Sequence, residues 1–375
     1  MNKINVYKKL AFILMLFANL SYADVCMNNN MVFKTSSFAP TRDEKFPIQI
    51  TLNNIKKIKS ALLEIRSIDN DLIKTLSIKN LEPDKNEYIV IWDGKDKNKN
   101  IVPNEVYFPV LTINLHSNQI CTVDPRIDSG GEEVYDFKKN ISASQVEYNL
   151  PVASRMLVRV GIKDGPLLRT IIDWEPRSAG FHAEHWNGQD EDNIIDIENN
   201  SKVGYLIMGY KLPSYSIITY GNKKENYRAY HERMKFSIQK KPYRTKKIIR
   251  NGEVIRPEFY NSVLKQKSPR INISIVDVKD NKEKTIISNF DEIIVKVGLN
   301  PLDEMYLNQD RYEVSFFVDN QFIAEEEQGF VPFTWRWSPK RHGIKPGKHV
   351  LTVNISGYSG QVGVKNIFFA LDAKP

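Results

Sequence analysis

Two stretches decide the fold: YIVIWDGKD, Tyr88–Asp96, and FHAEHWNGQD, Phe181–Asp190. In each stretch, a tryptophan ends a predicted strand, and a polar turn with a central glycine follows it. Tryptophan offers a large apolar surface with one N–H that still needs a partner. Glycine permits the positive φ that such a turn requires. We therefore interpret one set of residues as the marks of a structural repeat: Trp92, Gly94, Trp186 and Gly188.

The repeat extends to both sides of these tryptophans. An apolar segment starts thirty residues before each of them, LLEIRSIDNDLIKTL from Leu62 and MLVRVGIKDGPLLRTI from Met156. A tyrosine-containing strand follows each turn, EVYFPVLTI from Glu105 and VGYLIMGY from Val203. The pattern predicts a strand pair, a tryptophan-ended strand, a tight turn and a closing strand in each copy.

Composition and strand spacing favour several β-sandwiches. The chain has 375 residues, 41% of them apolar and 11% aromatic, which is enough for two to four packed domains. Short runs such as FPIQITL and EYIVIW are separated by Asn, Asp, Lys and Pro clusters, and no long amphipathic helix follows the N-terminal region. We predict an all-β fold class of tandem Ig-like β-sandwiches.

The first two copies resemble the Ig-like domain named after the flagellar hook-capping protein. The resemblance rests on IDNDLIKTL, the WDGKD turn and VPNEVYFPVL, and Asn104-Glu105-Val106 replaces a step that is usually Ser-Gly-Thr-like. The second copy keeps WNGQD and inserts EDNIIDIENNSK before Tyr205. The resemblance implies a β-sandwich over about residues 45–220 and does not imply a flagellar role.

A third unit resembles a general bacterial Ig-like module. The marks are FFVDNQFIAEEEQGFVPFTWRWS, from Phe316, and PGKHVLTVNISGYSGQVG, from Pro346. Alternation in HVLTVNI predicts a half-buried strand, with Leu351 and Val353 on one face and Thr352 and Asn354 on the other. The predicted organisation is a signal peptide at 1–23, Ig-like domains at 24–126, 140–221 and 268–375, and a basic linker at 222–267.

The N-terminus predicts export. Lys3, Lys8 and Lys9 precede the apolar run Leu10–Leu20, and SYA offers small residues for a signal peptidase. The run is too short to span a bilayer comfortably, and an uncleaved anchor is the alternative. We expect no transmembrane segment after signal removal, and a location in the periplasm or at the cell surface.

The chain has two cysteines, Cys26 and Cys121. In an oxidising compartment the simplest expectation is a disulfide between them, and two free thiols are the alternative. Val25 stands where a lipoprotein box requires a small residue, so we expect no lipidation.

The segment Lys223–Arg250 is strongly basic, with eleven Lys and Arg against two Glu and with interleaved aromatics. Its main interpretation is a solvated linker, and contact with an anionic polysaccharide or lipid surface is the alternative. We expect no nucleic-acid partner. The candidate partner-binding residues are Lys240, Lys241, Tyr243, Arg244, Lys246 and Lys247.

The remaining motifs give weak chemical signals. The oxygen-bearing residues after Asp93 alternate with lysines, and the positive charges of these lysines would repel a calcium ion. His182 and His185 would point to opposite faces of a strand, which disfavours zinc. We predict no catalytic residues, no cofactor and no metal. The predicted function is non-enzymatic binding or assembly with another envelope or surface protein. The alternative is a carbohydrate-active enzyme or accessory module that uses Asp190, Asp192 and Asp196.

Overall fold

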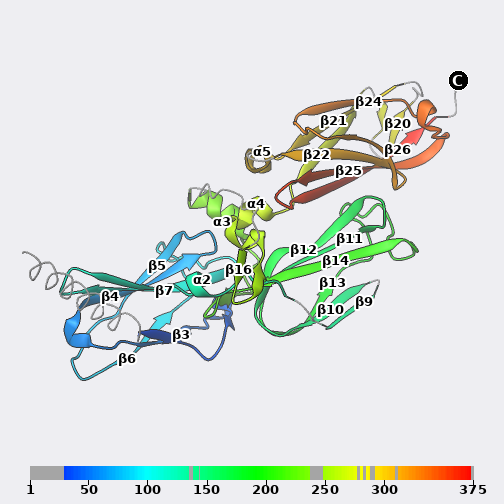
Figure 1. Cartoon of the computed structure of the whole chain (residues 1–375). Helices are drawn as coiled ribbons and strands as arrows, with labels where there is room; N and C mark the ends of the chain where they lie inside the picture. Colours follow the sequence, from blue (N-terminus) through cyan, green and yellow to red (C-terminus); the bar gives the residue numbers. More distant parts are fainter. Residues whose placement is uncertain are drawn as a thin grey trace, which may run out of the picture. The chain divides into compact units, whose positions relative to one another are not determined.

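The computed structural model describes residues 29–134, 138–142, 144–236, 248–276, 279–281, 284–287, 292–308 and 311–372. These residues form two compact units (Figure 1). Unit 1 contains the described residues up to Gly130 together with those from Leu212 to Phe236. Unit 2 contains Gly131–Lys211 and the described residues from Ile248 onward.

Unit 1 holds the first sandwich, whose two sheets share a core around Trp92. One sheet has the order β1-β3-β6, and the other has β2-β15-β7-β4-β5, with β8 also pairing with β7. Its elements are β1 (Asn30–Val32), β2 (Ser37–Phe38), η1 (Pro40–Arg42), β3 (Phe46–Thr51), η2 (Ile55–Lys57), β4 (Ile58–Ser67), β5 (Leu72–Ser77), β6 (Glu87–Trp92), β7 (Val106–Leu115), β8 (Ile120–Val123), α2 (Pro125–Asp128), β15 (Ile217–Thr219) and α3 (Tyr227–Arg233).

The middle sandwich opens unit 2 and repeats this arrangement. Its sheets have the orders β9-β10-β13 and β12-β11-β14, drawn in green in Figure 1. Val146, Tyr148, Met156 and Val158 bring the inner faces of both sheets into one core. Its strands are β9 (Lys138–Ser142), β10 (Gln145–Leu150), β11 (Ser154–Ile162), β12 (Leu167–Arg177), β13 (Gly180–His185) and β14 (Val203–Lys211).

A short segment and the third sandwich complete unit 2. The third sandwich has the sheets β18-β21-β24 and β19-β20-β26-β25-β22-β23. The elements are β16 (Ile248–Arg250), β17 (Glu253–Ile255), η3 (Pro257–Tyr260), α4 (Val263–Gln266), β18 (Ile271–Val276), β19 (Lys279–Asn281), β20 (Lys284–Ile287), β21 (Ile293–Leu299), α5 (Pro301–Leu307), β22 (Tyr312–Val318), β23 (Gln321–Glu326), β24 (Phe333–Trp337), η4 (Lys340–His342), β25 (Gly347–Gly357) and β26 (Val362–Leu371).

All three sandwiches share one strand order. The three-stranded sheets β1-β3-β6, β9-β10-β13 and β18-β21-β24 correspond to one another. In the second sheets, β7-β4-β5 corresponds to β14-β11-β12 and to β25-β22-β23. The all-β fold class of tandem sandwiches is therefore confirmed, and the third sandwich shares the order of these six strands with the first two.

Residues 212–236 belong to unit 1, although the sequence analysis divides them between the second Ig-like domain and a basic linker. Ile217 and Ile218 of β15 pair with Tyr107 and Val106 of β7. Helix α3 lies inside the predicted basic linker and also clusters with unit 1. Pairing between segments about 110 residues apart leaves no local sequence pattern, which is why periodicity did not indicate it.

Candidate interaction surfaces

The two repeated turns have the same backbone chemistry. Gly94 and Gly188 have φ of 68° and 73°. Asp96 is fully buried, and its Oδ1 accepts the N–H groups of Asn98 and Asn100 at 2.9 Å each. Asp190 is also fully buried, and its Oδ1 accepts the N–H groups of Ile194 and Ile195 at 2.5 and 2.9 Å. Each carboxylate therefore stabilises its own turn by accepting hydrogen bonds from the backbone N–H groups of that turn.

The tryptophans before these turns are core residues. Trp92 is fully buried, and its Nε1 donates to the Lys95 carbonyl at 3.0 Å. Trp186 is 7% exposed, and its Nε1 has no hydrogen-bond partner among the described residues. Each ring packs edge-on against a tyrosine of the next strand, Tyr107 at 5.3 Å and Tyr205 at 6.2 Å between ring centroids. These contacts make Tyr107 and Tyr205 equivalent positions in the repeat.

In unit 1, helix α3 covers the end of the sandwich that carries the WDGKD turn. The Tyr227 hydroxyl donates to Asp69 Oδ2 at 3.1 Å, and the Tyr230 hydroxyl donates to Asp96 Oδ2 at 3.3 Å. His231 Nε2 lies 3.6 Å from Asp71 Oδ2. The three side chains stand at positions i, i+3 and i+4 and share one helix face. The sequence pattern points to Asp96 only as one of the oxygen-bearing residues weighed for calcium, and it does not point to Asp69 or Asp71, because their helical partner lies far along the chain.

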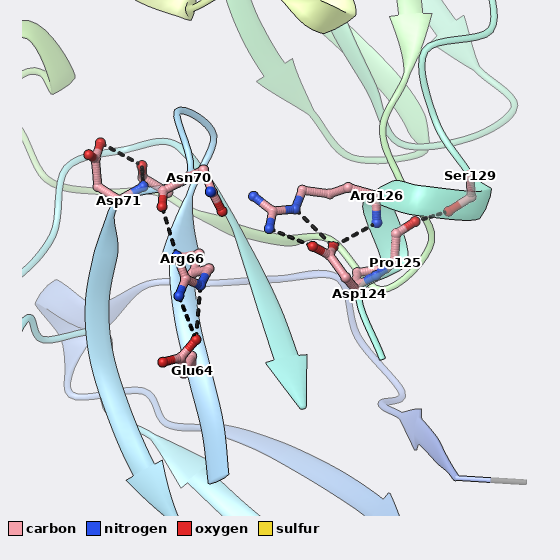
Figure 2. A network of polar contacts seen from close by, with 9 residues as sticks. Glu64, Arg66, Asn70, Asp71, Asp124, Pro125, Arg126 and Ser129 are labelled. Atoms are coloured by element: carbon pink, nitrogen blue, oxygen red, sulfur yellow. Dashed lines mark hydrogen bonds and ion pairs between the residues drawn. The ribbon is translucent and has the colours of Figure 1, made fainter. Parts of the chain in front are cut away.

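The β4–β5 turn beneath α3 is held by a polar network (Figure 2). Ser67 Oγ donates to Asp71 Oδ2 at 3.0 Å and accepts the Asp71 N–H at 3.0 Å. Arg66 pairs with Glu64 at 2.7 Å and donates to the Asn70 carbonyl at 3.1 Å. Arg126 of α2 pairs with Asp124 at 2.6 Å. Figure 2 draws this contact as well. Within this network, the two Ser67 bonds hold Asp71, the carboxylate that His231 of α3 contacts.

Burial controls the protonation of the Asp71–His231 contact. Burial raises the pKa of Asp71 to about 6 and lowers the pKa of the His231 imidazole. A stable ion pair would move both pKa values in the opposite directions, so desolvation outweighs attraction here. Near neutral pH we therefore describe the contact as a carboxylate beside a neutral imidazole.

In the middle sandwich, the end that carries the WNGQD turn contacts the third sandwich. Asn354 of β25 accepts the Leu167 N–H at 2.8 Å and donates to the Leu167 carbonyl at 3.0 Å. Asp192, next to the WNGQD turn, pairs with Lys365 and accepts the Asn366 N–H at 2.6 Å. The predicted half-buried strand is thus wrong in one respect, because Thr352 and Asn354 are also buried, at 1% and 5% exposure. The polar face of β25 is covered by a neighbouring domain.

The middle sandwich also lacks a closing strand among the described residues. Strand β7 is followed by β8 and β25 by β26, and each following strand pairs antiparallel with the one before it. After β14 the chain supplies β15 to unit 1 instead. Gly131 and Val134 donate to the Lys211 and Gly209 carbonyls at 2.8 and 3.1 Å, which covers only the end of β14.

Among the described residues, the start of β14 therefore has no strand partner on its outer edge. Backbone groups alternate in direction along an antiparallel strand, and those of Gly209 and Lys211 point away from β11. The N–H and C=O groups of Tyr205 and Ile207 consequently point to the same open side. Leu206 is 43% exposed, whereas Phe108, next to Tyr107 in β7, is fully buried. An uncharged, apolar open edge is a surface on which another strand can add.

The other predicted site residues have simpler positions. Cys121 is buried in β8, and Cys26 lies outside the described residues, so their disulfide stays a prediction. The predicted partner-binding set of Lys240, Lys241, Tyr243, Arg244, Lys246 and Lys247 also lies outside the described residues. His182 and His185 both lie in β13, and His182 Nε2 contacts the Ser178 carbonyl at 2.8 Å.

No helix in the described part of the chain has the length and apolar character needed to cross a membrane. No group of three His, Cys, Asp or Glu side chains in this part of the chain is arranged to hold a metal ion.

The comparisons with known proteins do not identify a family. No protein-family model matches the chain, and no curated protein matches it. The hook-capping resemblance is therefore not shown.

Similar solved structures include fibronectin(III)-like modules of Clostridium thermocellum CbhA, with 8% identity, 92% and 94% of the two chains covered and a TM-score of 0.19. A bacterial ice-binding adhesin has 9% identity, 92% and 98% coverage and a TM-score of 0.20. A tetra-tandem repeat of a large adhesion protein has 6% identity, 92% and 74% coverage and a TM-score of 0.20. At these scores the likenesses carry no argument, and the fold rests on the sheets described above.

Proposed function

We propose that this chain is an exported, non-enzymatic protein that binds or assembles with another protein of the cell envelope or surface. The open edge of β14 is the observation that carries the proposal. Its outward backbone groups at Tyr205 and Ile207 have no strand partner among the described residues, while the corresponding edges in the other two sandwiches are paired. Strand addition at such an edge supplies both affinity and orientation.

Export and the disulfide belong to the same proposal. Export rests on the basic and apolar N-terminal residues. The described residues contain no free cysteine, which supports the pairing of Cys121 with Cys26. An oxidising compartment outside the cytoplasm would provide the conditions for this bond.

A site-specific cross-link tests the binding role. A photoreactive amino acid replaces Leu206 in the full-length protein, which is produced in its native host. The expected product is a covalent adduct with one envelope or surface protein, with the cross-linked peptide identified by mass spectrometry and the adduct reconstituted from purified components. The control places the same group at Ile89, which is 71% exposed on the outer face of another sheet. Equal labelling at both positions, or no adduct at 206, would contradict the proposal.

The alternative enzyme uses Asp190, Asp192 and Asp196. Each of these carboxylates already has a structural contact: Asp190 with turn amides, Asp192 with the third sandwich and Asp196 with the Glu198 N–H at 3.0 Å. We therefore expect D190N, D192N and D196N to leave any glycan-hydrolysing activity of the purified protein unchanged. Loss of reducing-sugar release in one of these variants, with folding intact, would favour the enzyme.

A further inference from the structure

We propose that the closing strand of the middle sandwich is supplied by an extended, uncharged, β-branched segment of a partner protein, running antiparallel to β14 with two β-branched residues opposite Gly204 and Tyr205. The inference rests on the proposed binding function and names the class of partner segment. Three observations on this chain carry it: the direction of the equivalent strands, the chemistry of one of them, and the composition of the open edge.

The direction follows from the equivalent positions. Strand β8 pairs antiparallel with β7 from Leu111 to Asn114, and β26 pairs antiparallel with β25 from Gly347 to Ser356. Strand β15 also pairs antiparallel with β7, at Val106 and Tyr107. All three strands that cover this edge in the first and third sandwiches therefore run in the same sense. An antiparallel segment on β14 completes the middle sandwich in the same way.

Strand β15 provides a template for the chemistry. Its residues Ile217, Ile218 and Thr219 are all β-branched and are 0%, 5% and 2% exposed. They come from a part of the chain distant from β7, so β15 is a strand that a remote segment supplies to this sheet. Ile217 lies opposite Tyr107, the equivalent of Tyr205. The same register on β14 places the two β-branched residues opposite Tyr205 and Gly204.

The open edge itself fits an uncharged segment. Residues 203–210 of β14, VGYLIMGY, contain no charged side chain. Tyr205 and Ile207 pack against the middle core and are only partly buried, and Leu206 is 43% exposed. A β-branched segment would cover these side chains while its backbone pairs with theirs. A charged segment would lose hydration without gaining an ion pair on these residues.

A second copy of β14 fits this edge less well. Each copy carries residues 131–134 on the same edge, bonded to Gly209 and Lys211. Two β14 strands could therefore meet only over residues 203–207, and each 131–134 segment would then face the turn at 199–202 of the other copy. A free extended segment has no such obstruction, which is why we assign the edge to a partner.

The test uses the purified full-length mature protein and a peptide with the sequence of residues 214–220, Ser-Tyr-Ser-Ile-Ile-Thr-Tyr. Hydrogen–deuterium exchange with site resolution measures the backbone amides of Tyr205 and Ile207. Saturating peptide is expected to slow their exchange about tenfold or more, because an exposed amide becomes a ladder donor. Amides of β7 should not change, since β15 and β8 already cover that strand.

Matched controls separate strand addition from general adhesion. A peptide with Ile218→Pro should give no protection, because proline interrupts the ladder. The variant Leu206→Lys changes an exposed side chain, should keep its unfolding temperature, and should weaken binding of the unmodified peptide about tenfold by charging the edge. Equal protection by both peptides, or protection at β7 instead of β14, would overturn the inference.

The cross-link at position 206 distinguishes failure of the inference from failure of the proposed function. A partner adduct at 206 through a charged or helical segment overturns the inference and keeps the binding function. A 206-to-206 adduct between two copies also overturns it, because the occupant is then a second copy. No adduct and no peptide protection would overturn both.

Discussion

At the scale of single residues, equivalent positions in the repeat acquire different partners. Asp96 and Asp190 make the same turn, with Oδ1 bonded to backbone amides. Asp96 Oδ2 accepts the Tyr230 hydroxyl, whereas Asp190 Oδ2 has no partner among the described residues. Burial accordingly raises the pKa of Asp190. The turn is a local property, and the electrostatics of each aspartate depend on what the rest of the chain brings to it.

Asp71 gives a prediction on pH and stability. Its folded pKa is raised from 3.8 to about 6, so the folded state favours the protonated form. Protonation of Asp71 therefore stabilises the folded form of unit 1. This stabilisation is complete below pH 3.8 and is lost as the pH rises through about 6. Two pKa units correspond to about 3 kcal/mol at most. The lowered pKa of His231 acts in the opposite sense, because its protonation on acidification disfavours the folded state.

The variant Asp71→Asn removes the cost of the buried charge and can still accept the Ser67 hydrogen bond. We expect it to raise the unfolding temperature at pH 7.5 by several degrees and to change it little at pH 4.5. Thermal unfolding followed by circular dichroism at both pH values measures the difference. An equal effect at the two pH values would contradict a raised pKa.

At the scale of elements, α3 is a short helix whose stability comes from its cap and its contacts. Asn226 caps its first turn by accepting the Ala229 N–H at 2.9 Å. Tyr230 is fully buried and Tyr227 is 5% exposed. Seven residues are too few for an independent helix in water, so the three contacts with the aspartates must hold it in place.

We therefore predict that Asn226→Ala loosens α3 without unfolding unit 1. Loss of a cap costs about 1 kcal/mol, which corresponds to about fivefold faster exchange of the α3 amides if they exchange by local opening. Hydrogen–deuterium exchange of residues 227–234 measures this. The matched control is Asn300→Ala, which removes the cap of α5 by breaking its bond to the Leu302 N–H at 3.2 Å. Faster exchange of α3 in the control would show a global effect.

At the scale of the whole molecule, polar side chains hold the two sandwiches of unit 2 together. Asn354 bonds both backbone groups of Leu167, and Asp192 contacts Lys365 and Asn366. The same junction contains a buried Arg159, which is 6% exposed and donates to the Gly360 carbonyl at 3.2 Å. A polar junction of this kind separates more readily than a domain core.

Combining Asp192→Ala with Asn354→Ala should free the third sandwich from the middle one. We expect a larger radius of gyration by small-angle X-ray scattering and an almost unchanged circular dichroism spectrum, because the sheets of each sandwich remain. The control Asp196→Ala removes a carboxylate that bonds only its own turn in the described contacts. If the double variant and the control scatter identically, the junction depends on other contacts.

The disulfide is a further prediction at this scale. Intact mass measurement of the mature protein under non-reducing conditions should show a loss of two hydrogens relative to the reduced chain. The variant Cys121→Ser should lower the stability of unit 1, by about 4.7 kcal/mol on the loop-entropy estimate. Two alkylatable thiols in the mature protein would refute the bond.

The sequence determined the local parts of this protein and left open their partners. The tryptophans, the glycine turns and the apolar alternation of β3, β6 and β7 all depend on residues close in the chain, so periodicity predicted the strands and the repeat. The addition of β15 to β7, the docking of α3 on Asp69, Asp71 and Asp96, and the buried polar face of β25 depend on pairings across long separations. Only tertiary packing selects such pairings, because a strand edge or a polar face carries no local mark of what covers it. For the same reason, the local sequence of β14 does not show that it lacks, among the described residues, the following strand that β8 and β26 supply to the other two sandwiches.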